Sequence, residues 1–189
     1  TFFTAIVVWL ILHWSEKADD NGNERYILII AYMIGLATGV HLLNLLALPF
    51  LALIIFFRKF NFSYKGFAIT TLATGAVFYS INSGIINGMP KLVDKIGLPA
   101  LMLIYLIIFS SMVASIVKKK YLYALGLTST VLILIGYSSY AMIFIRSDQK
   151  PAINENDPST VSRAIAYMER EQYGRMFQFP RRYTGLPPK

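Results

Sequence analysis

The sequence contains no cysteine, and charged residues make up only 15% of its 189 residues, whereas soluble domains contain about 25%. Without cysteine the chain can form neither disulfides nor thiolate metal sites. The long apolar blocks contain no aspartate or glutamate, which argues against a proton relay of carboxylates inside a membrane. A phosphate loop, a dinucleotide fingerprint, a serine elbow and a metal-ligand cluster are also missing from the sequence. We therefore expect no metal and no cofactor.

Apolar residues account for 56% of the sequence, and the mean hydropathy is +0.53. The charges lie in short runs between apolar blocks, a pattern typical of polytopic membrane proteins. We predict an all-α transmembrane helical bundle with about six membrane segments. The chain begins inside an apolar run without a methionine and ends without a terminal motif, so we expect a fragment from within a longer protein. The apolar blocks are Phe2–Trp14, Tyr26–Phe57, Gly66–Asn87, Leu98–Val117 and Tyr121–Ile145.

The block from Tyr26 to Phe57 is too long for one membrane crossing. As a single helix it would measure about 48 Å at ~1.5 Å per residue, and the hydrocarbon core of a bilayer is about 30 Å thick. The block is therefore predicted to form two helices that meet at a polar joint. Glycines four residues apart in the joint favour close helix packing. The joint contains residues that a lipid-facing helix would avoid, namely Gly35, Gly39, His41, Asn44 and Pro49.

The basic residues favour this division of the block. If it forms two segments, three loops share one side of the membrane and carry eight basic residues, against Lys91 and Lys95 in the short loops opposite. Cytoplasmic loops are enriched in lysine and arginine, so we place the eight in the cytoplasm and the C-terminal tail outside. The net charge of +8 then fits anionic lipid headgroups better than nucleic acid. The eight are Lys17, Arg25, Arg58, Lys59, Lys65, Lys118, Lys119 and Lys120.

The sequence becomes polar after Ile145. We divide the chain into a transmembrane bundle, residues 1–145, and a non-cytoplasmic tail, residues 146–189. In the tail, Asp157 followed by Pro158 predicts a helix start with aspartate as the N-cap. Apolar residues then recur at helical spacing, and Gly174 is a stop signal. We predict a short amphipathic helix over about 158–173.

Polar residues at three places are candidates for binding a substrate. His41 and Asn44 are three residues apart and would share one helix face, where they would bind a phosphate or a sugar hydroxyl. Hydrogen bonding between helices is the alternative. Arg146 ends the last block and would bind a lipid-linked phosphate, or simply extend to the headgroups. The third place is the charged run before Gly174, for which a solvated helix face is the alternative to binding a substrate.

Two stretches of the chain, together with the segment that holds Trp9 and Trp14, resemble a known family. The first contains the string Gly-Val-His-Leu-Leu-Asn at residues 39–44, between Glu24-Arg25-Tyr26 and Phe57-Arg58-Lys59. The second runs from Arg146 to the string Arg-Glu-Gln-Tyr-Gly at residues 170–174. In this order the strings are similar to those of the bacterial, Bacteroidetes-type protein O-mannosyltransferase-like membrane proteins. The resemblance covers essentially the whole chain.

This resemblance implies a multi-spanning glycosyltransferase of the GT-C type in the bacterial inner membrane, with its tail on the periplasmic side. Such an enzyme takes a mannose-like sugar from a polyprenyl-phosphate carrier and transfers it to serine or threonine of an exported protein. The family's acidic catalytic motif lies upstream, so no catalytic residue is expected in this stretch, and the stretch alone is expected to be inactive. The substrate-binding candidates are His41, Asn44, Arg146, Arg170, Glu171, Gln172 and Tyr173.

Two other functions compete with this one. A transporter or flippase segment would show spans interrupted by glycine or proline in both halves, and this chain has one such block. A non-catalytic membrane scaffold would lack the upstream acidic motif. In each case membrane lipids are partners, and the enzyme would also bind the polyprenyl-phosphate sugar and an exported acceptor protein.

Overall fold

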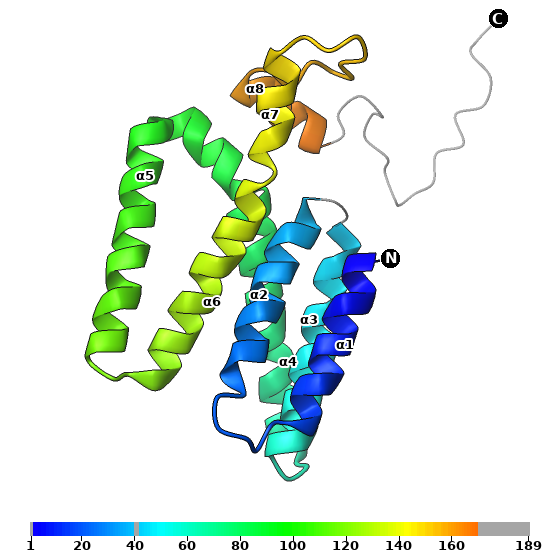
Figure 1. The fold of residues 1–189 in the computed structure, drawn as a ribbon, viewed down its shortest axis with the longest axis vertical. Helices are drawn as coiled ribbons and strands as arrows, with labels where there is room; N and C mark the ends of the chain where they lie inside the picture. Colours follow the sequence, from blue (N-terminus) through cyan, green and yellow to red (C-terminus); the bar gives the residue numbers. More distant parts are fainter. Residues whose placement is uncertain (1, 40–41, 170–189) are drawn as a thin grey trace, which may run out of the picture.

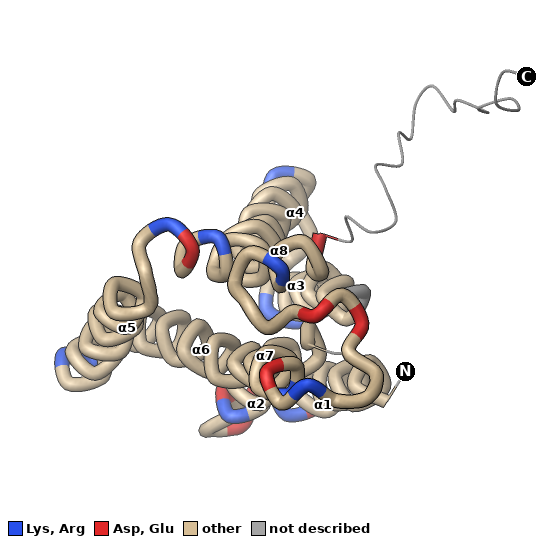
Figure 2. Tube along the Cα trace, turned by 90° about the horizontal axis from the view of Figure 1, so that it is seen from above, with Lys and Arg blue, Asp and Glu red and all other residues tan. Residues whose placement is uncertain are grey.

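The computed structural model describes residues 2–39 and 42–169, and every regular element in these ranges is a helix (Figure 1). This confirms the prediction of an all-α chain. The elements are α1 (Phe2–Glu16), α2 (Glu24–Thr38), the 3-10 helix η1 (Leu42–Leu46), α3 (Ala47–Lys59), α4 (Tyr64–Tyr79), the π-helix η2 (Ser80–Ile86), α5 (Gly88–Val117), α6 (Tyr121–Ser138), α7 (Ala141–Asp148) and α8 (Val161–Met168). Viewed from above, α6 lies between α5 and α2 (Figure 2), while α3 packs against both α1 and α4.

Three helical stretches are long and apolar enough to cross a membrane: Tyr64–Ile86, Gly88–Val117 and Tyr121–Asp148. They support an integral membrane protein. The prediction of about six membrane segments is not supported, because the helices in the first two apolar blocks are short. Helices α1 and α2 have 15 residues each and α3 has 13. At ~1.5 Å per residue they measure about 20–23 Å, less than the roughly 30 Å of a bilayer core.

The block from Tyr26 to Phe57 forms two helices, as predicted. Helix α2 ends at Thr38, and after η1 the chain runs back along α3 to Lys59. The end of α3 lies beside the loop between α1 and α2, as shown by the hydrogen bond from the Lys59 ammonium to the carbonyl of Ala18 in that loop. The joint between the two helices therefore lies at the opposite end of the hairpin (Figure 1).

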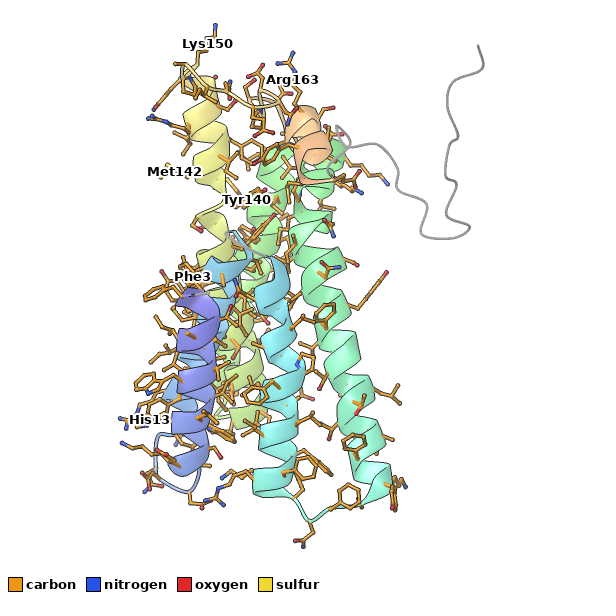
Figure 3. The ribbon with its side chains drawn as sticks, turned by 90° about the vertical axis from the view of Figure 1, so that its right-hand side faces the viewer. Phe3, His13, Tyr140, Met142, Lys150 and Arg163 are labelled. Atoms are coloured by element: carbon orange, nitrogen blue, oxygen red, sulfur yellow. The ribbon has the colours of Figure 1, made fainter. Side chains whose placement is uncertain are left out.

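The three loops predicted to share one side of the membrane, residues 15–25, 58–65 and 118–120, do lie at one end of the molecule (Figure 1), which we call the basic end. Arg58 at the end of α3 pairs with Asp19 between α1 and α2. The hydroxyl of Tyr121 at the start of α6 donates to Glu24 at the start of α2. Helices α7 and α8 lie at the opposite end, which we call the α8 end (Figure 3).

Helix α5 bends sharply at Gly97, where φ is 80° and ψ is 163°. That combination of angles is essentially restricted to glycine. Gly88 to Ile96, before the bend, is helical, so the connection between the third and fourth apolar blocks, which holds Lys91 and Lys95, is a helical segment. Pro99 lies in the first turn after the bend, where a helix tolerates proline because that backbone nitrogen needs no partner.

Helices α2 and α6 form the most extensive helix contact in the described chain. A Cβ atom added at Gly35 would lie 2.4 Å from the carbonyl oxygen of Ile133, and one added at Gly136 would lie 2.6 Å from the backbone nitrogen of Leu36. The two glycines therefore allow the backbones of α2 and α6 to touch. The interpretation of the Gly35–Gly39 spacing as a packing motif is confirmed at Gly35, whereas a Cβ at Gly39 would meet nothing closer than 3.4 Å.

Candidate functional site

The polar joint between α2 and α3 is built around Asn44, whose side chain is buried. Its amide nitrogen donates to the carbonyl oxygen of Ala37 at 3.3 Å, and its carbonyl oxygen accepts from the hydroxyl of Thr4 on α1. Nearby, the Thr38 hydroxyl donates to the carbonyl oxygen of Gly35 at 2.7 Å. Asn44 thus connects α1, the end of α2 and η1 with hydrogen bonds that the apolar surroundings protect from competition. Its part in substrate binding stays a prediction.

Five of the predicted binding residues lie outside the described residues. They are His41, Arg170, Glu171, Gln172 and Tyr173. The expected pairing of His41 with Asn44 therefore lies outside the described residues as well. The tail helix ends at Met168 with Glu169 as its C-cap, earlier than the predicted end near Tyr173.

Arg146 lies in the last turn of α7, which continues the direction of α6 beyond Tyr140 (Figure 3). Its side chain is exposed and makes no hydrogen bond or ion pair with another described residue. A Cβ at Gly39 would lie 3.5 Å from the Tyr140 ring, so the polar joint touches the start of α7. Arg146 is six residues further along, about 9 Å at ~1.5 Å per residue. The structure thus brings the joint and Arg146 to the same end of the bundle.

A second polar cluster at the α8 end surrounds the carboxylate of Asp157. It accepts hydrogen bonds from Asn154 at 3.0 Å, from Ser147 at 3.3 Å and from the guanidinium of Arg163. A hydrogen bond with Ser159, supplemented by the charge of Arg163, holds the pKa of Asp157 below its usual value. The carboxylate therefore fixes the loop between α7 and α8.

The tail helix begins later than predicted, at Val161, and its N-cap is Thr160 rather than Asp157. The Thr160 hydroxyl accepts from the backbone nitrogen of Arg163 at 3.4 Å. Asp157 adopts a left-handed conformation with φ of 42°, and its carboxylate is used by the loop instead. The dense run of turn-forming residues from Asn154 to Thr160 favours such a loop, and the prediction of a helix start at Asp157-Pro158 is wrong.

Helix α8 packs across the first part of α5. Ala164 is buried in this contact, Met168 packs against the buried apolar side chains inside the bundle, and Glu169 pairs with Lys91 on α5. The hollow between the two helices is open and shallow, and it is lined by Asn87, Pro90, Lys91, Ile165, Met168 and Glu169. Within residues 2–39 and 42–169 no group of three or more histidine or carboxylate side chains is placed to hold a metal ion.

We expect the stability of the loop between α7 and α8 to depend on pH through Asp157. Its folded pKa is lowered, so the ionised carboxylate stabilises the loop above the usual pKa of 3.8, and this stability is lost as the pH falls through the folded pKa. Amide hydrogen exchange over residues 147–163, corrected for intrinsic rates, should be slow at pH 6 and faster below about pH 4. Asp157→Asn should speed exchange at pH 6 and remove its dependence on acid.

The matched control is Glu155→Gln, which neutralises a carboxylate in the same loop that makes no hydrogen bond to a described residue. It should leave exchange at pH 6 unchanged. Equal exchange in the Asp157→Asn variant and the unmodified protein at pH 6 would contradict the role given to this carboxylate.

Comparison with known proteins gives one family match. The family model described as the protein O-mannosyl-transferase TMEM260 N-terminal domain matches residues 1–64. The match covers α1, α2, η1 and α3, the N-terminal third of the chain, and includes the Asn44 joint. It supports the resemblance to O-mannosyltransferase-like proteins over the first of the two stretches that carry it, while the stretch from Arg146 lies outside it. No curated protein and no solved structure matches the chain.

Proposed function

We propose that this chain is part of an integral-membrane glycosyltransferase of the GT-C type, which transfers a mannose-like sugar from a polyprenyl-phosphate carrier to serine or threonine of exported proteins. The observation that carries the proposal is the match of residues 1–64 to a protein O-mannosyl-transferase domain. The three helical stretches that are long and apolar enough to cross a membrane agree with it, because the lipid-linked donor is itself held in the membrane.

The distribution of charge supports an orientation for such an enzyme. The eight basic residues of the basic end face the cytoplasm under the positive-inside rule. The α8 end, with the Asn44 joint, Arg146 and the tail, then lies outside, in the periplasm of a bacterium with this protein in its inner membrane. Lysine and arginine are intermixed there with acidic residues (Figure 2). The joint and the tail thus share the face on which exported proteins are modified.

The chemistry divides between this chain and the rest of the proposed enzyme. A carboxylate supplied from outside this chain accepts the proton of the acceptor hydroxyl. The hydroxyl oxygen forms a bond to the anomeric carbon, the bond from that carbon to the phosphate oxygen breaks, and the electron pair leaves with the lipid phosphate. Arg146 is our leading candidate for binding this phosphate, because a guanidinium donates two parallel hydrogen bonds to phosphate oxygens. His41 is the second candidate.

A transfer assay tests this function directly. Membranes containing the complete gene product are mixed with a serine- and threonine-rich peptide and either polyprenyl-phosphate mannose or a nucleotide-linked mannose, each radiolabelled. We expect label on the peptide from the lipid-linked donor only. Transfer from the nucleotide sugar alone, or no transfer from either, would refute the proposal.

The alternative functions give different results in related assays. A flippase would move the lipid-linked sugar across proteoliposomes without modifying the peptide. A scaffold would do neither, and it would bind the donor no better than the carrier phosphate alone.

A further inference from the structure

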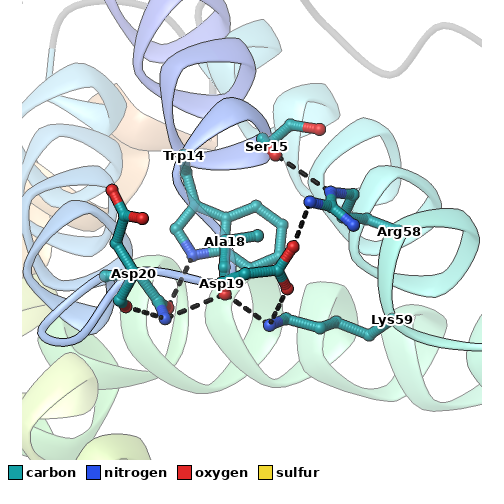
Figure 4. A network of polar contacts seen from close by, with 8 residues as sticks. Trp14, Ser15, Ala18, Asp19, Asp20, Arg58 and Lys59 are labelled. Carbon is teal, nitrogen blue, oxygen red and sulfur yellow. Dashed lines mark hydrogen bonds and ion pairs between the residues drawn. The ribbon is translucent and has the colours of Figure 1, made fainter.

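The two clusters of basic residues at the basic end are used differently by the protein. Arg58 donates to the backbone carbonyl of Ser15 at 3.1 Å and pairs with Asp19, and Lys59 bonds to the same carboxylate and to the carbonyl of Ala18 (Figure 4). The hydrogen bond from Arg58 lowers the pKa of Asp19. The charges of Arg58 and Lys59 therefore hold α3 to the loop between α1 and α2.

The second cluster, Lys118, Lys119 and Lys120, has no such partner within the described residues. All three side chains are exposed, and none of their ammonium groups makes an ion pair or a hydrogen bond with another described residue. The Lys120 ammonium lies 5.8 Å from the centre of the Tyr123 ring. The carboxylate of Glu24 accepts a hydrogen bond from the hydroxyl of Tyr121, the residue that follows the three lysines.

The backbone holds these lysines in a tight turn that directs them outward. The backbone nitrogen of Lys120 donates to the carbonyl of Ser115, and that of Lys119 to the carbonyl of Ile116, each at 3.0 Å. Lys119 itself has a φ of 52°. The chain thus reverses between α5 and α6 within three residues, all of them lysine.

This lysine turn lies at the ends of two candidate membrane spans. It joins two helical stretches that are long and apolar enough to cross a membrane: the first is α5, which ends at Val117, and the second, Tyr121–Asp148, begins with α6. The flanking side chains are largely exposed: 74% for Val117, 76% for Leu122 and 69% for Tyr123. Apolar and aromatic side chains at the end of a span favour the boundary between hydrocarbon and headgroups. The lysines one residue beyond are therefore at the level of lipid phosphates.

We propose that the lysine turn (Val117–Tyr123) is a binding site for the headgroup phosphates of anionic phospholipids. The lysines supply three uncompensated charges, while Val117 and Leu122 contact the acyl chains of the same lipid molecules. Lysines close to an anionic membrane surface each add to its attraction, and three together amount to a preference on the order of 100-fold over a zwitterionic lipid. This site does not depend on the sugar-transfer proposal.

Native mass spectrometry of the purified protein tests the site. The protein is equilibrated in detergent with equal amounts of phosphatidylglycerol and phosphatidylcholine, and the lipids retained per protein are counted. We expect retained phosphatidylglycerol to exceed phosphatidylcholine. The triple variant K118Q/K119Q/K120Q should lower the retained phosphatidylglycerol at least about tenfold, and raising the salt concentration should lower it for the unmodified protein. Detergent removes any effect of membrane orientation.

Two control variants separate this site from general electrostatic attraction. K91Q/K95Q removes two lysines from the α8 end and should retain phosphatidylglycerol like the unmodified protein. R58Q/K59Q removes the other basic cluster and should lower the melting temperature while keeping the lipid preference. The proposal is overturned if the triple variant retains as much phosphatidylglycerol as the unmodified protein, or if K91Q/K95Q loses as much as the triple variant.

Discussion

Gly35→Ala and Gly136→Ala are each expected to destabilise the bundle strongly, by about 3 kcal/mol. Each added methyl group would meet backbone atoms of the facing helix at 2.4–2.6 Å, and a backbone cannot rotate away as a side chain can. The helices α2 and α6 must therefore separate, and the contact between them is the most extensive in the described chain. A melting temperature measured in detergent should fall by roughly 6–12 °C.

The matched control is Gly126→Ala on the same helix α6. A Cβ at this position meets nothing within 4 Å. Since glycine inside a helix costs about 0.5–1 kcal/mol relative to alanine, this substitution should raise the melting temperature slightly. Gly136→Ala and Gly126→Ala are the same chemical change on the same helix, yet their expected effects on the melting temperature have opposite signs. A Gly35→Ala protein that melts at or above the unmodified one would disprove the close crossing of α2 and α6.

Arg146→Ala should reduce sugar transfer by about 10²-fold or more while leaving the melting temperature unchanged. Removing one donor to a developing negative charge typically costs about 10²–10³ in kcat. The exposed Arg146 side chain makes no hydrogen bond or ion pair within residues 2–39 and 42–169, so its loss removes no observed packing. The measurement is kcat for transfer from polyprenyl-phosphate mannose, with the complete protein.

Two further variants separate the hydrogen-bonding role of Arg146 from the general effect of losing a positive charge. Arg146→Lys keeps the charge but loses the paired hydrogen bonds, so it should restore only part of the rate. Lys95→Ala removes an exposed cation at the same end of the molecule and should leave kcat within a factor of two. Full transfer by Arg146→Ala would exclude the arginine from binding the leaving phosphate, without affecting the wider assignment to sugar transfer.

The hairpin of α2 and α3 was predictable from the sequence because two independent constraints agreed. The stretch from Tyr26 to Phe57 exceeds one bilayer thickness, and only a reversal places the eight basic residues on one side. The number of spans was not predictable in the same way. The sequence shows how long an apolar block is, but it does not show how long each helix inside the block will be. The position at which η1 interrupts this block is decided by tertiary contacts, such as those of Asn44 with Thr4 and Ala37.

Gly136 shows a different limit of the sequence. The spacing of Gly35 and Gly39 predicts close packing, yet the residue that completes the contact, Gly136, lies on α6 about a hundred positions further along the chain. A close crossing needs a small residue on each helix, and a single sequence gives no indication of which distant glycine is paired. The prediction that Asp157 caps the tail helix is wrong for a local reason. An aspartate side chain can either cap a helix or stabilise a turn. Here the hydrogen bonds from Ser147 and Asn154 hold the carboxylate in the turn.

The bend at Gly97 has a consequence for the evolution of this chain. An added Cβ would find room there, since its nearest neighbour would be the Cδ of Pro99 at 3.6 Å. The restriction lies in the backbone angles, which side chains other than hydrogen rarely permit. The bend at Gly97 directs the rest of α5 back alongside α6 and leaves the first part of α5 to pack against α8. Both contacts thus depend on the backbone conformation of this one glycine. Selection would therefore retain glycine at position 97 because of its backbone angles, although a side chain there would meet no crowded neighbour.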